Sequence, residues 1–239
     1  MSSVINLSHA FADEEVEVPL AEALPFPQHT YSAFLKSEIR ALVRRNDAEV
    51  IQAARRKNKD LVKKVNNFLE RQLLDESLDA VLAKIIDDSL FRAHFRKDVS
   101  KQGIHETTQM AWLRRFHPDV QLLDKRTGPC LCDGVLVDGA CRPATATKTL
   151  DAFIPSTNTY CVLKYTSEAG GAQDNQFNDV KEFIKQFNVF LKGGDTEMRL
   201  ACYLDGAYYT EKKYEMLRSM VSAEFADRVS ITNMESLTA

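Results

Sequence analysis

The chain has 239 residues, of which 44% are hydrophobic and 27% charged, a composition typical of a soluble globular protein with one large or two small domains. No apolar run approaches the length of a membrane span, which excludes an integral membrane protein. The formal net charge of −3 neither indicates nor excludes a nucleic-acid partner, because phosphate binding depends on a local basic surface.

The first 99 residues divide into two predicted segments. Residues 1–26 lack the basic start and long apolar centre of a signal peptide, and we expect a flexible, loosely ordered acidic arm there. Residues 27–99 are predicted to form a helical N-terminal region, because glycine is absent up to Lys97 and apolar residues repeat at the helical period. Three helices are expected: 30–46, capped by Thr30 or Ser32; 47–75, with Asp47 as N-cap; and 75–95.

Residues 100–239 have the pattern of an α/β core. A helix over residues 100–120 is predicted to end at His117, because Pro118 follows. After it the hydrophobic period changes to two, which indicates short strands separated by turns. The order of elements predicts a mixed central sheet flanked by helices, with strands in 120–124, 130–139, 148–155, 160–166, 197–206 and 228–234 and helices over about 173–192 and 210–226.

The five cysteines are odd in number and scattered, which favours free thiols in a reducing compartment, and we expect a cytoplasmic protein. A zinc site is the alternative for three of them. Their CxC spacing has no second matching pair, so strand and turn thiols are the prediction for Cys130, Cys132 and Cys141.

Two charged residues fall within predicted strands. If the strands around Asp151 and Lys164 form a hairpin through residues 155–158, the two side chains meet at one edge of the sheet. The alternative to a functional role is a simple, partly buried ion pair. Isolated pairs of this kind contribute little net stability, so this alternative explains the arrangement only weakly.

The helix after these strands adds further polar candidates. Its apolar stripe, extended backwards, predicts that Gln173, Asp174 and Gln176 in the first turn are directed towards the end of the sheet. Asp179 and Glu182 fall off the stripe and are expected to face water. The alternative for Asp174 is a first-turn acid that interacts favourably with the helix dipole.

Glu106 is a third candidate acid, on a helix face shared with apolar residues. Its alternative is likewise a first-turn acid near the helix dipole. Carboxylates from several elements that converge beside a lysine suit a hard divalent cation such as Mg²⁺. The lysine would orient or deprotonate an attacking water, or stabilise charge on a phosphate, so phosphodiester hydrolysis is the predicted reaction.

The order Glu106 on a helix, Asp151 on a strand and Lys164 on the next strand resembles the PD-(D/E)xK nucleases, and type II restriction endonucleases in particular, over residues 100–234. This resemblance implies a restriction-endonuclease-like fold for a nuclease-like core over 100–239. It further implies that Asp151 is a metal ligand, that Lys164 is catalytic and that Glu106 assists at the metal. The implied cofactor is Mg²⁺, and the implied partners are double-stranded DNA and a second copy of the chain.

The sequence departs from the family pattern at two positions. Val162 stands two residues before the lysine, where the family has an acid, and Leu150 precedes Asp151 in place of proline. Some family members supply the missing carboxylate from the following helix. Asp174 is the candidate metal ligand there, with possible support from Gln173, Gln176 and Glu168.

Basic residues cluster near the second predicted helix and are candidates for neutralising DNA phosphates; the candidate contacts are Arg55, Arg56, Lys59, Lys63 and, from the later helix, Asn175. A solvated helix face paired with acids is the alternative for the cations, and local capping for the asparagine. The leading hypothesis is a sequence-specific, magnesium-dependent DNA endonuclease. The alternatives are a non-catalytic DNA-binding or scaffold protein on a decayed nuclease fold, which Val162 supports, and a single-strand or repair nuclease.

Overall fold

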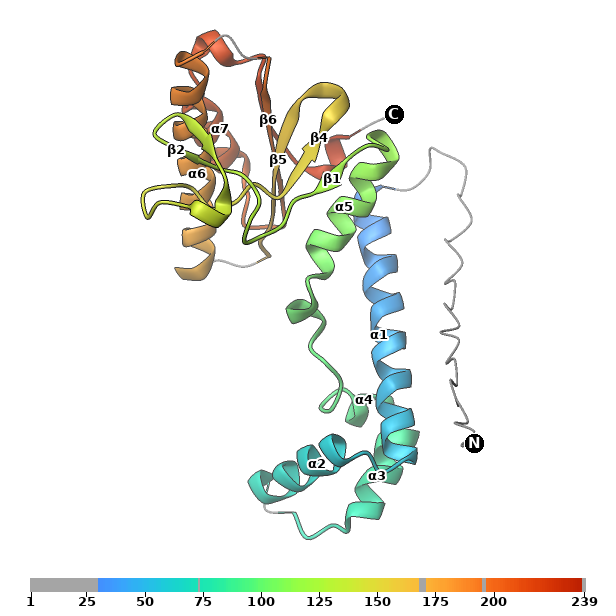
Figure 1. Cartoon of the computed structure of the whole chain (residues 1–239). Helices are drawn as coiled ribbons and strands as arrows, with labels where there is room; N and C mark the ends of the chain where they lie inside the picture. Colours follow the sequence, from blue (N-terminus) through green and yellow to red (C-terminus); the bar gives the residue numbers. More distant parts are fainter. Residues whose placement is uncertain (1–29, 73, 168–170, 195–196, 238–239) are drawn as a thin grey trace, which may run out of the picture.

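A five-stranded sheet with helices on both faces forms the larger part of the molecule, and a long helix connects it to a small cluster of helices (Figure 1). The computed structural model describes residues 30–72, 74–167, 171–194 and 197–237. The acidic arm predicted for residues 1–26 lies outside this range. None of the described helices is both long and apolar enough to cross a membrane.

The sheet is mixed, as the sequence predicts. Its strand order is β1-β4-β5-β6-β7, in which β1, β4 and β5 are antiparallel neighbours and β5, β6 and β7 run parallel. A separate hairpin is formed by β2 and β3. The strands are β1 (Gln121–Leu122), β2 (Cys130–Cys132), β3 (Val135–Val137), β4 (Ala152–Ile154), β5 (Thr159–Tyr165), β6 (Arg199–Asp205) and β7 (Val229–Thr232).

Two hydrophobic clusters cover the two faces of this sheet. On one face α6 (Gly171–Lys192) and α7 (Glu211–Ser219) pack on side chains that include Val162. On the other, α5 (Ile104–Phe116) and the start of α1 (Tyr31–Arg55) pack on side chains that include Leu163. Neighbouring residues of β5 enter opposite clusters because side chains alternate along a strand.

The third cluster lies at the far end of α1, where that helix meets α2 (Lys59–Gln72), α3 (Leu78–Asp87) and α4 (Ser89–Arg92). The predicted break between two helices at Asp47 is wrong, because α1 continues through it to Arg55. Asp47 pairs instead with Arg96, 3.5 Å away, so a contact with a later segment replaces the predicted N-cap. The chain turns after α1 through Lys57, whose φ is +49°.

The helix predicted over 75–95 divides into α3 and α4, and the strand predicted over 130–139 is the β2–β3 hairpin, whereas other boundaries agree with the sequence. Thr30 caps α1 by accepting a hydrogen bond from the backbone N–H of Ala33, and α5 ends before His117. The last predicted helix is too long, because α7 ends at Ser219 and a separate turn follows. The short 3₁₀ segments are η1 (Val99–Gln102), η2 (Gly139–Cys141), η3 (Pro155–Thr157), η4 (Ala223–Phe225) and η5 (Met234–Ser236).

Candidate active site

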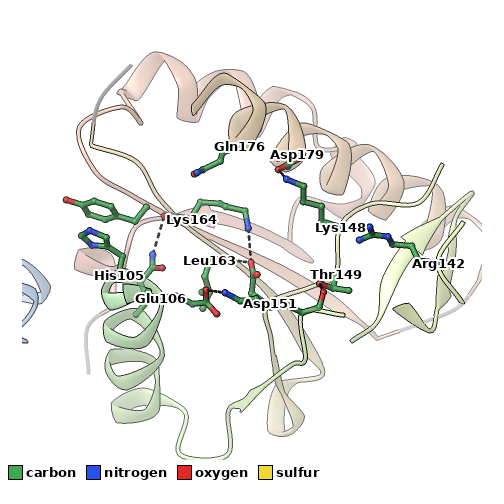
Figure 2. Close-up of a pocket in the computed structure, with 14 residues that line it drawn as sticks. His105, Glu106, Arg142, Lys148, Thr149, Asp151, Leu163, Lys164, Gln176 and Asp179 are labelled. Carbon is green, nitrogen blue, oxygen red and sulfur yellow. Dashed lines mark hydrogen bonds and ion pairs between the residues drawn. The ribbon is translucent and has the colours of Figure 1, made fainter. Parts of the chain in front are cut away.

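A cavity of about 480 Å³ lies where the N-terminal part of α5, the end of β5 and the early turns of α6 converge (Figure 2). Asp151 and Lys164 both line it, together with Glu106. Figure 2 shows that the labelled side chains reach it from elements far apart in the sequence. Three of the sequence candidates are therefore brought to one place.

The predicted hairpin is confirmed, and it brings Asp151 to Lys164. Ala152 pairs with Cys161 in the β4–β5 register, which leaves Asp151 one residue beyond the last pair. Lys164 Nζ lies 3.0 Å from Asp151 Oδ2, and the side chains of the two residues are 15% and 13% exposed. The same Oδ2 accepts a hydrogen bond from the backbone N–H of Leu163 at 2.8 Å. Asp151 thus satisfies a strand amide that β4 no longer reaches, a structural role that stands beside any catalytic one.

Two further ion pairs line the cavity. Lys125, which follows β1, pairs with Glu106 on α5. Lys148 lies 2.7 Å from Asp179 on α6, and in both pairs the lysine is much more exposed than the carboxylate. The carboxylates are fixed on helices, whereas the lysines reach in from loops.

The cavity carries a small excess of positive charge. Among the described residues that line it, Arg142 and three lysines are positively charged, whereas three carboxylates are negatively charged. His105 adds no charge near neutral pH, because burial lowers the pKa of its imidazole below the usual value. Its ring stacks on that of Tyr165, with centroids 3.5 Å apart. A cavity of this charge and size suits an anionic ligand with a flat group at its edge.

Gln109 connects the strand that carries Lys164 to a buried carboxylate. Its Nε2 donates hydrogen bonds to the Lys164 carbonyl oxygen at 3.2 Å and to Asp205 Oδ2 at 2.6 Å. Burial raises the pKa of Asp205 to about 6, although the hydrogen bonds from Gln109 and from the backbone N–H of Met234 act in the opposite direction. This network holds the end of β5 against α5.

The first turns of α6 are placed differently from the prediction. Asp174 is exposed, accepts a hydrogen bond from the Tyr208 hydroxyl and does not belong to the cavity lining. Asp179, which the sequence predicts to face water, lines the cavity instead, as does Gln176. Gln176 accepts a hydrogen bond from the Thr166 hydroxyl at 2.9 Å.

The other sequence candidates on this segment do not reach the cavity or cannot be placed. Asn175 is exposed and outside the lining. Glu168 and the side chain of Gln173 lie outside the described residues. Val162 is fully buried in the core between sheet and α6, so the position at which the nuclease family carries an acid holds no polar group here.

Two of the lining carboxylates have the chemistry of a magnesium site. Mg²⁺ is typically held by one or two carboxylates together with substrate phosphate oxygens and water. Both described hydrogen bonds of the Asp151 carboxylate end on Oδ2, which leaves Oδ1 for a ligand, and Glu106 offers a second carboxylate. No cluster of three or more His, Cys, Asp or Glu side chains suited to a metal exists in the part of the chain that the structure describes. Asp151 and Glu106 are therefore the two lining carboxylates that a magnesium ion would use, fewer than the three that the sequence predicts.

The cysteines are all free. Cys130 and Cys132 are buried in β2, whereas Cys141 is exposed on η2. Burial raises the pKa of Cys161 and Cys202 to about 12, so these thiols stay protonated and behave as core residues.

The predicted phosphate-binding cations lie away from the cavity, at the turn between α1 and α2. Arg55, Arg56, Lys59 and Lys63 are all exposed. Two of the three acids of α1 pair elsewhere, Asp47 with Arg96 and Glu49 with Lys97. A cationic surface remains here, which we call the basic arm and define as Arg55, Arg56, Lys59 and Lys63.

No protein-family model, no curated protein and no solved structure matches the chain. The resemblance to PD-(D/E)xK nucleases accordingly rests on Glu106, Asp151 and Lys164 and on the order of the elements that carry them.

Most of the polar groups that surround these three residues are not predicted by the sequence. The segments that carry Lys125, Lys148 and Arg142 are rich in turns. They have no periodic pattern that would indicate where these side chains point. Asp179 carried a signal that could have been used, because it lies three residues after Gln176 and hence on the same side of α6.

Proposed function

We propose that the protein is a magnesium-dependent endonuclease that hydrolyses phosphodiester bonds of double-stranded DNA. The observation that carries this proposal is the contact between Lys164 Nζ and Asp151 Oδ2 inside a cavity with excess positive charge. A phosphodiester is an anion, and it would be held by Lys125, Lys148 and Arg142 at the mouth of the cavity.

Asp151 and Glu106 would hold the magnesium ion, which when bound polarises a phosphoryl oxygen and lowers the pKa of a coordinated water. Lys164 then has two tasks that its position supports. Its ammonium group stabilises negative charge that develops on the phosphate, and it orients the attacking water by donating a hydrogen bond. Lys125 would leave Glu106 when the cation binds and turn to the phosphate, because its side chain is long and exposed.

Plasmid cleavage tests this proposal. The full chain is incubated with supercoiled plasmid and Mg²⁺, and we expect discrete fragments. Lys164→Ala should lower the cleavage rate by about 10²-fold or more, since it removes a group that acts on the transition state. Lys185→Ala is the matched control, because this exposed lysine of α6 lies outside the cavity and pairs with Glu182. Circular dichroism confirms that each variant is folded.

A non-catalytic DNA-binding protein is the second candidate function. Buried Val162 supports it, because this position supplies no metal ligand, and so do the lysines that already neutralise all three lining carboxylates. DNA binding by the wild-type chain without any cleavage in Mg²⁺ would decide for this candidate. Exonucleolytic smears in place of fragments would indicate a single-strand or repair nuclease.

The resemblance to type II restriction enzymes extends the proposal: the protein would act as a homodimer and recognise one DNA sequence. This extension rests on the resemblance alone. The free thiols support a reducing, cytoplasmic compartment. Sedimentation of the protein with and without a DNA duplex measures the number of copies bound.

A further inference from the structure

A second cavity, of about 410 Å³, shares Tyr165 with the first. It is bounded by the first turns of α1, by the carboxyl ends of β5 and β6 and by the segment around η5. Tyr165 and Asp205, the last residues of these two strands, are register partners. Crevices outside the carboxyl ends of parallel strands are frequent ligand sites in α/β proteins.

The Tyr31 hydroxyl in this cavity lacks a hydrogen-bond partner within the described residues, and the Tyr209 hydroxyl has only the Thr166 side chain near it. Tyr31 and Tyr209 are 3% and 7% exposed, and both line the cavity. The hydroxyl of Thr166, near Tyr209, donates its own hydrogen to Gln176. The neighbouring Tyr214 differs, because its hydroxyl donates to the carbonyl oxygen of Leu204. Buried polar groups without a partner are rare and costly, so a ligand that pairs with both hydroxyls would be stabilised.

The cavity is acidic as well as aromatic. Asp205, only 7% exposed, accepts one described hydrogen bond on each carboxylate oxygen, from Gln109 and from the Met234 N–H, and each oxygen has a further lone pair. Glu235 is a second carboxylate in the lining, and the exposed Lys36 is the one cation among the described lining residues. The lining is therefore net negative.

The tyrosines around Asp205 present neutral hydroxyls. Burial, together with the nearby Asp205 carboxylate, raises the pKa of Tyr31 and Tyr165 above the usual tyrosine value. Burial is also the largest effect on Tyr209 and raises its pKa to about 12, although the nearby Thr166 side chain acts in the opposite direction. At neutral pH these groups act as hydrogen-bonding hydroxyls on aromatic walls, and the negative charge comes from the two carboxylates.

We propose that this second cavity binds the primary ammonium group of a small alkylamine, through the Asp205 carboxylate and the hydroxyl oxygens of Tyr31 and Tyr209. A primary ammonium has three N–H donors, which matches one carboxylate and two hydroxyl acceptors. The tyrosine rings stabilise the cation further through their faces. A quaternary ammonium has no N–H to donate to either hydroxyl oxygen, so the primary amine is the preferred class. This inference does not depend on the proposed nuclease function.

Isothermal titration calorimetry of the full chain with 1,4-diaminobutane tests the inference. We expect saturable binding to one site, and no such binding of butane-1,4-diol, which has the same length and no charge. Tyr31→Phe removes only the hydroxyl and should weaken binding about tenfold, the usual effect of losing a hydrogen bond to a charged group. This variant keeps the ring and its packing against Trp112.

Lys36→Gln provides a test in the opposite direction. Removal of this exposed like charge should strengthen diamine binding several-fold, and Lys192→Gln, at the far end of α6, should not change it. The inference is overturned by the absence of saturable binding at millimolar diamine, by equal binding of the diol, or by affinities that neither Tyr31→Phe nor Lys36→Gln alters.

Discussion

The fold buries the Asp205 carboxylate at the end of β6, and the effect of this burial on the free energy of unfolding can be measured as a function of pH. Desolvation is the largest effect on its pKa, which rises from 3.8 to about 6. The folded protein therefore holds a proton on this group between these two values, whereas the unfolded chain has released it. The contribution of Asp205 to stability is most favourable below pH 4, declines as the pH rises to 6 and then stays constant.

Asp205→Asn should remove this pH dependence. The difference in the free energy of unfolding between variant and wild type should shift by about 3 kcal/mol in favour of the variant as the pH rises from about 4 to above 6. Urea denaturation at a series of pH values measures it. A difference that stays constant over this range would contradict the assignment of the raised pKa to Asp205.

At the level of secondary-structure elements, the turn that follows β6 depends on a glycine. Gly206 has a φ of +98° and lies against the backbone of Thr166, which follows β5. The Thr166 N–H donates to the Asp205 carbonyl oxygen at 2.8 Å, and the Tyr208 N–H donates to the Thr166 carbonyl oxygen at 3.1 Å. Glycine is required for this close approach, because a Cβ at position 206 would collide with the Thr166 carbonyl oxygen.

Gly206→Ala should therefore destabilise the fold by about 2–4 kcal/mol, through backbone strain and steric overlap together. Gly103→Ala is the matched control, because Gly103 also has a positive φ, of +65°, but no atom within 4 Å of an added Cβ. We expect the control to cost only about 1 kcal/mol. Urea unfolding of both variants measures the difference, and equal losses would show that the contact with Thr166 is unimportant.

Across the molecule as a whole, α1 joins the basic arm to the α/β core. Its 25 residues correspond to a length of about 37 Å. Tyr31 and Leu35 near its start belong to the core cluster under the sheet, whereas Ala54 near its end belongs to the cluster of α2 and α3 (Figure 1). The basic arm is thus held at a distance from the cavity. On the proposed function, it would contact DNA that flanks the bond to be cut.

Neutralisation of the basic arm should weaken DNA binding without altering the chemistry. The test variant has Arg55, Arg56, Lys59 and Lys63 all changed to Gln. A plot of the logarithm of its DNA association constant against the logarithm of salt concentration should be less steep, by about 0.9 for each DNA phosphate that the protein no longer neutralises. Fluorescence anisotropy with a DNA duplex at several salt concentrations measures the slope. The cleavage rate at saturating DNA should stay unchanged, and an unchanged slope would remove these cations from the DNA interface.

The sequence alone was sufficient for the mixed sheet, several helix ends and the meeting of Asp151 with Lys164. These features depend on local information: side-chain alternation in a strand, the helical period, and a short turn that joins two neighbouring strands. The fold class and the centre of the candidate site therefore follow from residues close together in the chain.

Only the tertiary structure decided the rest of the cavity and the course of α1. Asp47 has the chemistry of an N-cap, yet its contact with Arg96, distant in the sequence, keeps it inside a continuous helix. Asp179 has the pattern of a solvent-facing acid, yet Lys148 approaches it from a loop whose path no periodicity encodes. Local patterns fix which face of an element is apolar, whereas contacts between distant segments fix which polar groups meet, because they depend on how whole elements pack.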